Sequence, residues 1–140
     1  MKGMQMETTN SLRKVIETAL NSLKSTYGIK EVSYRIASTD AMYPHVVYHI
    51  TSVTPADMGR LDFLLDVDVW DKNQARAFEI LDAIRTMFAF WNAPQDDILP
   101  TFFDESTGTI DDPDKTIIHL VLRLQGQVYK GVATNGSIIH

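Results

Sequence analysis

One stretch in the middle of the sequence changes its hydrophobic period and constrains the fold more than any other feature. In RLDFLLDVDVW (60–70), the apolar residues are mostly at odd positions, whereas Asp62, Asp66 and Asp68 are at even ones. Because successive strand side chains point to opposite faces, this alternation predicts a long half-buried β-strand with an acidic outer face. From Asn73 the apolar residues recur with the period of an α-helix. A strand that leads into a core-facing helix is typical of a layered α+β or α/β domain.

Length, charge and cysteine content exclude several classes of protein. At 140 residues the chain is long enough for one domain with a substantial core. Its net charge of −5 argues against non-specific nucleic-acid binding, which depends on Lys and Arg neutralising phosphates. The absence of cysteine excludes disulfides, thiolate metal sites and cysteine nucleophiles. The segment MKGMQMETTN has no apolar h-region, and no apolar run reaches the roughly 20 residues that cross a bilayer, so we expect no secretory signal and a soluble protein.

Periodicity along the chain predicts seven elements in the order helix, three strands, helix, two strands. The first helix is expected to begin at Asn10 or Ser11, where a short polar side chain can cap it. It should end near Tyr27, because Gly28 is suited to a left-handed C-cap. The other predicted elements are strands at 31–38, 45–52 and 60–70, a helix at 73–91, and strands at 101–110 and 116–129.

These elements predict an α+β fold. Short connections favour antiparallel pairing, so we expect a mostly antiparallel sheet of about five strands, with two helices packed on one face. Residues 1–140 are interpreted as a single domain. Within it, residues 1–9 are a flexible lead-in, residues 10–129 form the α+β body, and residues 130–140 form a tail that is loose or ordered only against a partner.

The face of the sheet opposite the helices should mix charged and apolar side chains, and a metal site is the sharpest interpretation of it. Asp66 and Asp68 share one strand face and His45 and His49 share another, and such groups ligate hard cations and transition metals. Residues two apart on a strand are about 7 Å apart and point in parallel, which does not by itself make a converging cage. The residues expected on this face are Arg35, His45, Val47, His49, Asp62, Leu64, Asp66, Asp68, His119, Val121 and Arg123.

Two other interpretations of this face remain open. Its charges could simply face water and pair across strands, each pair contributing about 0.2–1 kcal/mol. Alternatively, Val47, Leu64 and Val121 would be exposed apolar groups among charges, a mixture that resembles a protein interface with a polar rim.

No other pattern predicts catalysis or a cofactor. The sequence contains neither a Gly-rich phosphate loop nor a nucleophile elbow. Trp91 is expected in the core, and Trp70 is expected to cover the start of the second helix. Of Phe102 and Phe103, one should face the core and the other the surface, because strand neighbours point opposite ways. We therefore expect a protein that is not an enzyme.

Taken together, the chain resembles the tail-terminator and tail-completion proteins of long-tailed phages and prophages, which are minor tail proteins. The resemblance lies in an amphipathic opening helix, a strand entered through YPHVVYHI, a strand ending LDVDVW, a helix beginning near Asn73, and DDPDKTIIHLVLRLQG leading through a turn into a final strand. It extends from about Leu12 to Tyr129 and depends on order and spacing more than on any one residue. The family offers no catalytic residue to match.

The resemblance implies a structural protein that acts by assembly. Such a subunit forms a ring, typically six-fold, at the head-proximal end of the tail tube, where it ends tube polymerisation and forms the head–tail joining surface. Its partners would be copies of itself, the tail-tube protein and a head-completion protein, with no membrane involved. Genomic DNA would pass through the bore without specific binding. The protein would be found in the virion, at the head–tail junction, after assembly in the bacterial host cytoplasm.

Within that hypothesis, two groups of residues are candidates for contact. Carboxylates that line a bore would repel phosphate, and a mixed face can be buried between subunits. The bore or interface candidates are Asp62, Asp66, Asp68, Leu64, Arg35 and Arg123. The loop after the second strand supplies the partner-contact candidates Thr54, Asp57, Met58 and Arg60, since loops on a rigid scaffold often carry binding.

Three alternative functions remain. A head–tail connector or head-completion protein would share the size, the acidity and the ring assembly. A small metal-dependent hydrolase would use the acidic strand face. An adaptor domain would bind a partner peptide at a sheet edge.

Overall fold

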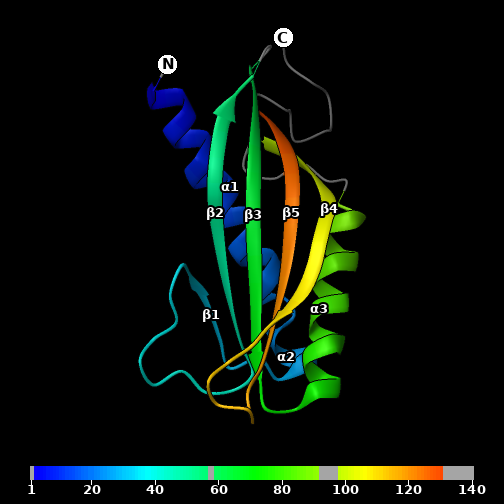
Figure 1. Cartoon of the computed structure of the whole chain (residues 1–140). Helices are drawn as coiled ribbons and strands as arrows, with labels where there is room; N and C mark the ends of the chain where they lie inside the picture. The colour runs from blue at the N-terminus through cyan, green and yellow to red at the C-terminus, as the bar shows by residue number, and fades with distance from the viewer. Residues whose placement is uncertain (1, 57–58, 92–97, 131–140) are drawn as a thin grey trace.

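The fold is a single five-stranded sheet with two long helices behind it (Figure 1). This computed structural model describes residues 2–56, 59–91 and 98–130. The elements are α1 (Lys2–Asn21), α2 (Lys24–Tyr27), β1 (Glu31–Tyr34), β2 (His45–Pro55), β3 (Arg60–Asp71), α3 (Gln74–Ala89), β4 (Ile98–Ile110) and β5 (Ile118–Lys130). The predicted α+β class and the order of the main elements are confirmed.

The sheet has the strand order β1-β2-β3-β5-β4. Four strands pair antiparallel, as expected from their short connections, but β1 runs parallel to β2. The sheet is therefore mixed rather than purely antiparallel. The cause is the segment 35–44, which carries the chain from the end of β1 back to the level where β1 began, so that β2 starts beside Glu31.

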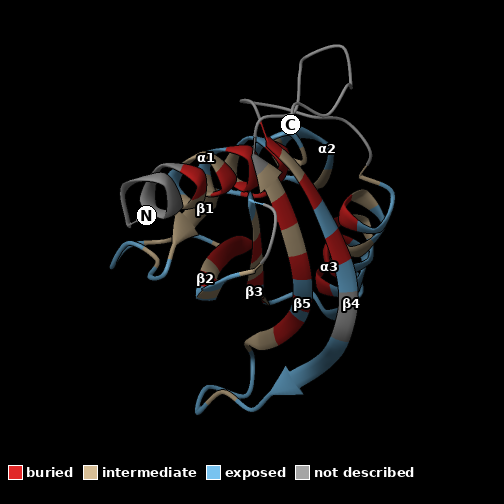
Figure 2. Ribbon diagram, turned by 90° about the horizontal axis from the view of Figure 1, so that it is seen from above, coloured by how far each residue is buried: buried red, intermediate tan, exposed pale blue. Residues whose placement is uncertain are grey.

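The core lies between one face of the sheet and the helices α1 and α3. The predicted parity is confirmed, because the odd residues of β3 and the even residues of β2 and β5 are buried along most of their length, as the alternating colours along the strands show (Figure 2). The helices contribute stripes at helical spacing, including Leu12, Ile16 and Leu20 on α1 and Ile80, Ile84 and Phe88 on α3.

Close packing in this core depends on one glycine of β5. A Cβ atom added to Gly126 would lie 2.2 Å from Cζ of Phe63 and 2.7 Å from the backbone oxygen of Thr101. The space is taken by Phe63, whose ring meets Phe102 edge-to-face at 5.5 Å. Phe102 is buried and Phe103 is exposed, which confirms the prediction that this pair is divided between core and surface.

The first helix differs from the prediction at both ends. It begins at Lys2, so residues 2–9 belong to the helix rather than to a flexible lead-in. Asn10 does not cap it, because its Oδ1 instead accepts a hydrogen bond from Nη2 of Arg13 at 3.3 Å. The helix is interrupted after Asn21 and resumes as α2, which ends at Gly28 in the predicted left-handed conformation, with φ of 68°.

The strands also differ in their bounds. β1 ends at Tyr34 rather than at residue 38, because Arg35 adopts a positive φ of 70° and turns the chain. β2 and β4 are longer than predicted, β2 extending to Pro55 and β4 beginning at Ile98. The second long helix begins close to the predicted residue 73 and is capped by Asn73, whose side chain accepts a hydrogen bond from the backbone N–H of Arg76. The predicted loose tail lies outside the described residues after Lys130.

Candidate functional site

The face of β2, β3 and β5 opposite the helices, here called the outer face, collects most of the predicted site residues. The strand register places Asp66 between His49 of β2 and Arg123 of β5. It places Asp68 between two valines, Val47 and Val121, one on each neighbouring strand. The even positions of β3 therefore form an acidic line along the middle of the outer face, as the alternation predicted.

Each aspartate of this line has a cationic or imidazole neighbour. Asp66 Oδ1 lies 3.7 Å from Nε of Arg123, and Asp62 Oδ1 lies 3.1 Å from Nε of Arg60. These two pairs are partly exposed, so water screens them and each adds little to stability. Asp68 Oδ2 makes the shortest contact, 2.6 Å from Nε2 of His119 on β5. Cross-strand pairing therefore accounts for Asp66 and Asp68, whereas Asp62 pairs with a residue of its own strand.

The same geometry disfavours the metal interpretation. Asp66 and Asp68 contact different partners on β5, one a guanidinium and the other an imidazole, and do not converge on a common point. Across the described part of the chain, no group of three or more His, Asp or Glu side chains is arranged to hold a metal ion. A hydrolase built on this acidic line would lack the converging oxygens that hard cations require.

One end of the outer face carries a row of stacked rings formed by Tyr43, His45, Trp70 and His119, here called the aromatic row. His45 and Trp70 stack with ring centroids 5.1 Å apart, and Trp70 and His119 stack at 4.0 Å. Tyr43 continues the row at 5.2 Å from His45. The prediction that Trp70 covers the start of the second helix is wrong. Its even position in β3 directs it to the side of the sheet away from α3.

The aromatic row changes which apolar residues are open on this face. Val47 and Val121, expected to be exposed, are only 6% and 8% exposed, and they lie next to the row on their strands. His45 is buried as well, its Nδ1 has no hydrogen-bond partner among the described residues, and burial lowers the pKa of this imidazole. On the outer face Leu64 is exposed (38%), and on the neighbouring strand β4 so are Phe103 (49%) and Ile110 (40%), the latter paired with His119 of the aromatic row.

The remaining predicted contact residues are scattered. Arg35 is exposed in the turn after β1 and is not part of the outer face. Thr54 pairs with Asp62 near the end of β2, and Arg60 begins β3, so both belong to strands rather than to a loop. Asp57 and Met58 lie outside the described residues.

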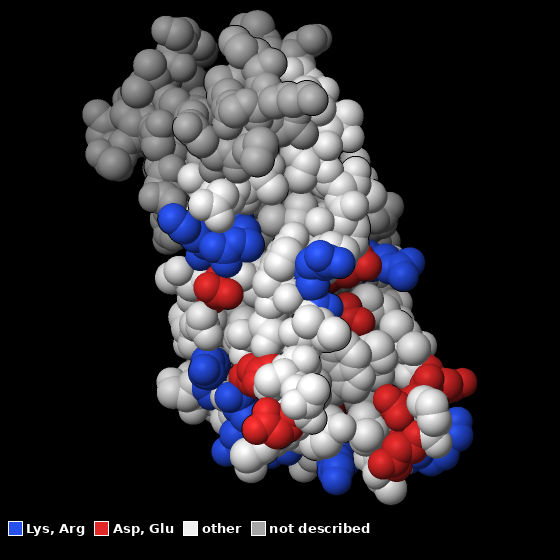
Figure 3. All heavy atoms as spheres, turned by 90° about the vertical axis from the view of Figure 1, so that its left-hand side faces the viewer, with Lys and Arg blue, Asp and Glu red and all other residues white. Residues whose placement is uncertain are grey.

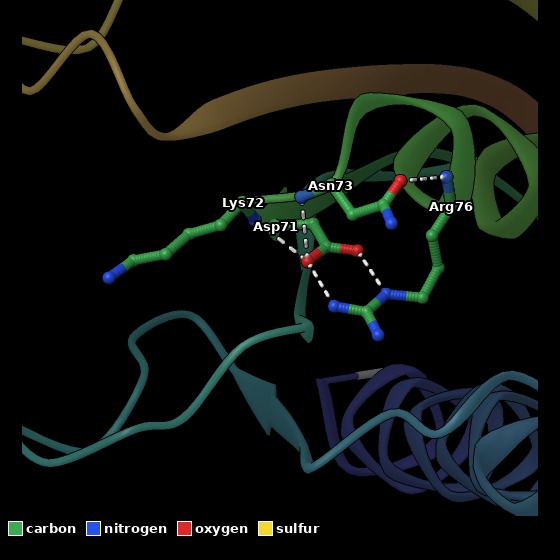
Figure 4. A network of polar contacts seen from close by, with 4 residues as sticks. All are labelled: Asp71, Lys72, Asn73 and Arg76. Atoms are coloured by element: carbon green, nitrogen blue, oxygen red, sulfur yellow. Dashed lines mark hydrogen bonds and ion pairs between the residues drawn. The ribbon is translucent and has the colours of Figure 1, made fainter.

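Sequence reasoning missed one buried acidic residue, Asp71, at the junction between β3 and α3 (Figure 4). Its carboxylate is fully buried and accepts two hydrogen bonds from Arg76, both 2.6 Å long. The backbone N–H groups of Lys72 and Asn73 donate to the same carboxylate. Burial alone would raise the pKa of Asp71, but these hydrogen bonds outweigh burial and hold the pKa below its usual value. The signal was available, since Asp71 occupies an odd position in β3 and so belongs to the core face.

The helical side of the molecule has a shallow groove of about 610 Å³ between α3 and the end of the first helical segment. Its polar lining consists of Glu79, Asp82, Thr86 and the hydroxyl of Tyr27, and Asp82 pairs with Arg85 at 3.6 Å. The lining includes no histidine, cysteine or lysine. The full lining is Leu23, Tyr27, Glu79, Asp82, Ala83, Thr86 and Met87.

Charge on the surface is mixed. On the side of the molecule that carries β1, Lys and Arg lie interspersed with Asp and Glu (Figure 3). This side therefore lacks the single-sign basic patch that nucleic-acid binding requires. None of the described helices has both the length and the apolar character needed to cross a membrane.

Comparison with known proteins finds similarity in fold. No protein-family model matches the chain, and no curated protein matches it by sequence. A chain from the virion of a native gene transfer agent (GTA) particle matches with a TM-score of 0.68 at 11% identity, covering 86% of this chain and 96% of that one. A second solved protein, of no stated function, matches with a TM-score of 0.58 at 11% identity, covering 86% and 94%. At this level of identity the likeness establishes a shared fold.

Proposed function

We propose that this protein is a structural virion protein of a tailed phage or prophage. In this proposal it assembles as a ring at the head-proximal end of the tail tube, ends tube polymerisation and forms the head–tail joining surface. It acts by assembly and not by catalysis. Its partners are copies of itself, the tail-tube protein and a head-completion protein, and it resides at the head–tail junction of the virion.

The observation that carries this proposal is the likeness to the gene transfer agent virion chain. The match covers 86% of this chain and 96% of that chain, so it concerns the complete arrangement of elements and not a local motif. Fold alone does not determine function. The likeness gains weight because the order and spacing of the sequence motifs also resemble those of phage tail proteins.

The outer face supports an assembly role more than a catalytic one. Its carboxylates are paired with Arg123, His119 and Arg60, an arrangement that offers neither a converging metal site nor an activated nucleophile. The exposed Leu64 lies among these pairs, which resembles the composition of a partly polar interface. A bore lined by this face would present carboxylates to passing DNA and disfavour its adhesion.

Solution mass measured against protein concentration tests the proposal, with purified tail tubes added in a second step. We expect a discrete closed oligomer, near six subunits, and binding at one end of each tube seen by electron microscopy. Tubes assembled with the protein present should have a narrower length distribution than tubes assembled without it. A protein that stays monomeric and leaves tube ends and lengths unchanged would contradict the proposal. Binding only to tail-less heads would instead favour the head-completion alternative.

A further inference from the structure

The sheet has two edges, and the strand β4 at one of them is long and open. β4 is the last strand in the order, and β5 is its one strand partner among the described residues (Figure 1). Within the described parts of the chain, no other backbone hydrogen bond reaches the free side of β4. Such an edge presents unpaired N–H and C=O groups that can accept another strand.

The second half of β4 lacks two of the usual protections of an edge, a charged residue and a proline, and its only such device is the register shift that precedes it. Every residue from 106 to 110 is exposed, as the pale blue end of β4 in Figure 2 shows, and Oγ1 of Thr107 accepts a hydrogen bond from Nη2 of Arg85 on α3 at 3.4 Å. The segment follows a register shift between Asp104 and Ser106, and it contains neither a charged residue nor a proline. Natural edge strands are commonly guarded by lysine or proline, so an unguarded edge indicates a strand-pairing surface.

The two edges of the sheet carry opposite charges at their ends. Acidic residues flank 106–110 in the sequence, with Asp111 and Asp112 after it and residues 104 and 105 before it. The other edge strand, β1, is flanked by Lys30 and Arg35. Both basic side chains are exposed, and neither forms an ion pair with any described residue.

The acid within β1 does not oppose this pairing. Glu31 already accepts hydrogen bonds from the side chains of Ser33 and Ser38 and from the backbone N–H of Ser38. These bonds lower the pKa of Glu31 to about 2, so its charge is engaged within its own subunit. Lys30 and Arg35 are therefore the charges that β1 presents to a neighbour.

Strand direction determines how two copies could join. β1 runs with β2, β2 opposes β3, β3 opposes β5 and β5 opposes β4, so β4 runs opposite to β1. Copies related by rotation about an axis along the strands would place β4 of one beside β1 of the next in antiparallel orientation. That arrangement brings Lys30 to the end of β4 marked by Asp111.

We propose that β1 of one copy of this chain adds to the free edge of β4 in the next copy, antiparallel, with Lys30 facing Asp111. The joint is heterologous, since two different surfaces meet, and heterologous joints that close produce rings. This joint extends the proposed function, because it names the contact that closes the ring. It rests on the proposed function in one respect, that copies of the chain associate. Each outer face then lies on the same side of one continuous sheet.

Pairing between two β4 strands is the competing arrangement, and the charges disfavour it. Two antiparallel copies of β4 would bring the acids after residue 110 toward the acids before residue 106 of the other copy. Like charges opposite one another across a strand pair are destabilising. The basic ends of β1 remove this repulsion and replace it with attraction.

Charge reversal tests the joint. The variants Lys30→Glu and Asp111→Lys should each weaken self-association about threefold to tenfold, measured by sedimentation at low salt. The double variant should restore association to within about twofold of the unmodified protein, because the pair is then reversed and not lost. Lys14→Glu, an exposed reversal on α1, serves as the matched control and should leave association unchanged.

Each contrary result has a distinct meaning. If neither Lys30→Glu nor Asp111→Lys changes the mass or the affinity of the oligomer, the edge joint is overturned and the ring proposal stands. Rescue of Asp111→Lys by Arg35→Glu, but not by Lys30→Glu, would overturn the antiparallel arrangement. A monomer at every concentration would overturn the edge joint together with self-assembly, leaving only the capture of the protein at tube ends to be judged.

Discussion

Asp68 and Asp71 lie three residues apart on the same strand, yet they occupy opposite environments. Asp71 is fully buried on the core face and receives two hydrogen bonds from Arg76 and two from backbone amides. Asp68 lies on the outer face, partly open to water, with a single contact to His119. The two residues differ because positions 68 and 71 point to opposite faces of the sheet. The same residue type therefore stabilises the junction between β3 and α3 at one position and lies on the surface at the other.

The largest expected effect comes from removing the buried carboxylate. Asp71→Ala should destabilise the protein by about 2–3 kcal/mol, because the N–H groups of Lys72 and Asn73 lose their acceptor, whereas Arg76, whose side chain is 39% exposed, can turn to water. Urea denaturation followed by circular dichroism measures this. A loss below about 1 kcal/mol would place Asp71 in the same class as the outer-face aspartates and remove the contrast.

A second test compares glycines on two adjacent strands of the sheet, Gly126 on β5 and Gly108 on β4. Gly126→Ala should cost about 1–3 kcal/mol, because the new methyl group would meet Phe63 and the backbone of Thr101. Gly108→Ala is the matched control, since its Cβ would meet only Val121 at 4.0 Å. Equal thermal midpoints for the two variants would show that the core beside Gly126 relaxes to accept the added methyl group.

Acid should destabilise the fold through two carboxyl groups whose pKa values are lowered, Asp71 and Glu31. The pKa values of Asp71 and Glu31 lie below their ordinary values of 3.8 and 4.5, and Glu31 falls to about 2. Depressed carboxyl pKa values stabilise the fold above the unfolded pKa, and this stability is lost as the pH falls through the folded pKa. Unfolding free energy should therefore decline steeply below about pH 4.5, and the decline should be shallower in Glu31→Gln. If unfolding free energy falls equally steeply with pH in Glu31→Gln, Glu31 is not a source of the pH dependence.

The smallest effect is expected on the outer face. Asp66→Ala should change stability by less than about 1 kcal/mol, because its contact with Arg123 is 3.7 Å long and that side chain is more than half exposed. A double-mutant cycle with Arg123→Ala isolates the pair. A coupling above about 2 kcal/mol would show that this pair is more desolvated than its exposure indicates.

Prediction from sequence succeeded where periodicity is long. The alternation of β3 assigned both of its faces, and the stripe on α3 identified Ile80, Ile84 and Phe88 as core. It failed at short or interrupted segments. β1 has four residues and a parallel partner, which no local pattern reveals, and the helix of the first segment breaks after Asn21 without a glycine or proline.

The candidate site was predicted in composition but not in arrangement. The acidic line was expected, but His119 as the partner of Asp68 was not. That contact joins residues 51 positions apart and depends on the register of β3 against β5. The aromatic row likewise needs three strands in register before its rings can stack, so His45, Trp70 and His119 give no signal while they are separate in the sequence.

The sequence by itself determined the α+β class, the faces of the long strands, the start of the second long helix near Asn73 and the acidic character of the outer face. These features follow from side-chain direction and backbone preference over a few residues, which are local properties. Only the tertiary structure decided which valines are covered, that Asp71 is locked by Arg76, and that β1 and β4 remain as edges of opposite charge. Those outcomes depend on pairing between distant segments, where register and burial are set by the whole sheet and not by any one strand.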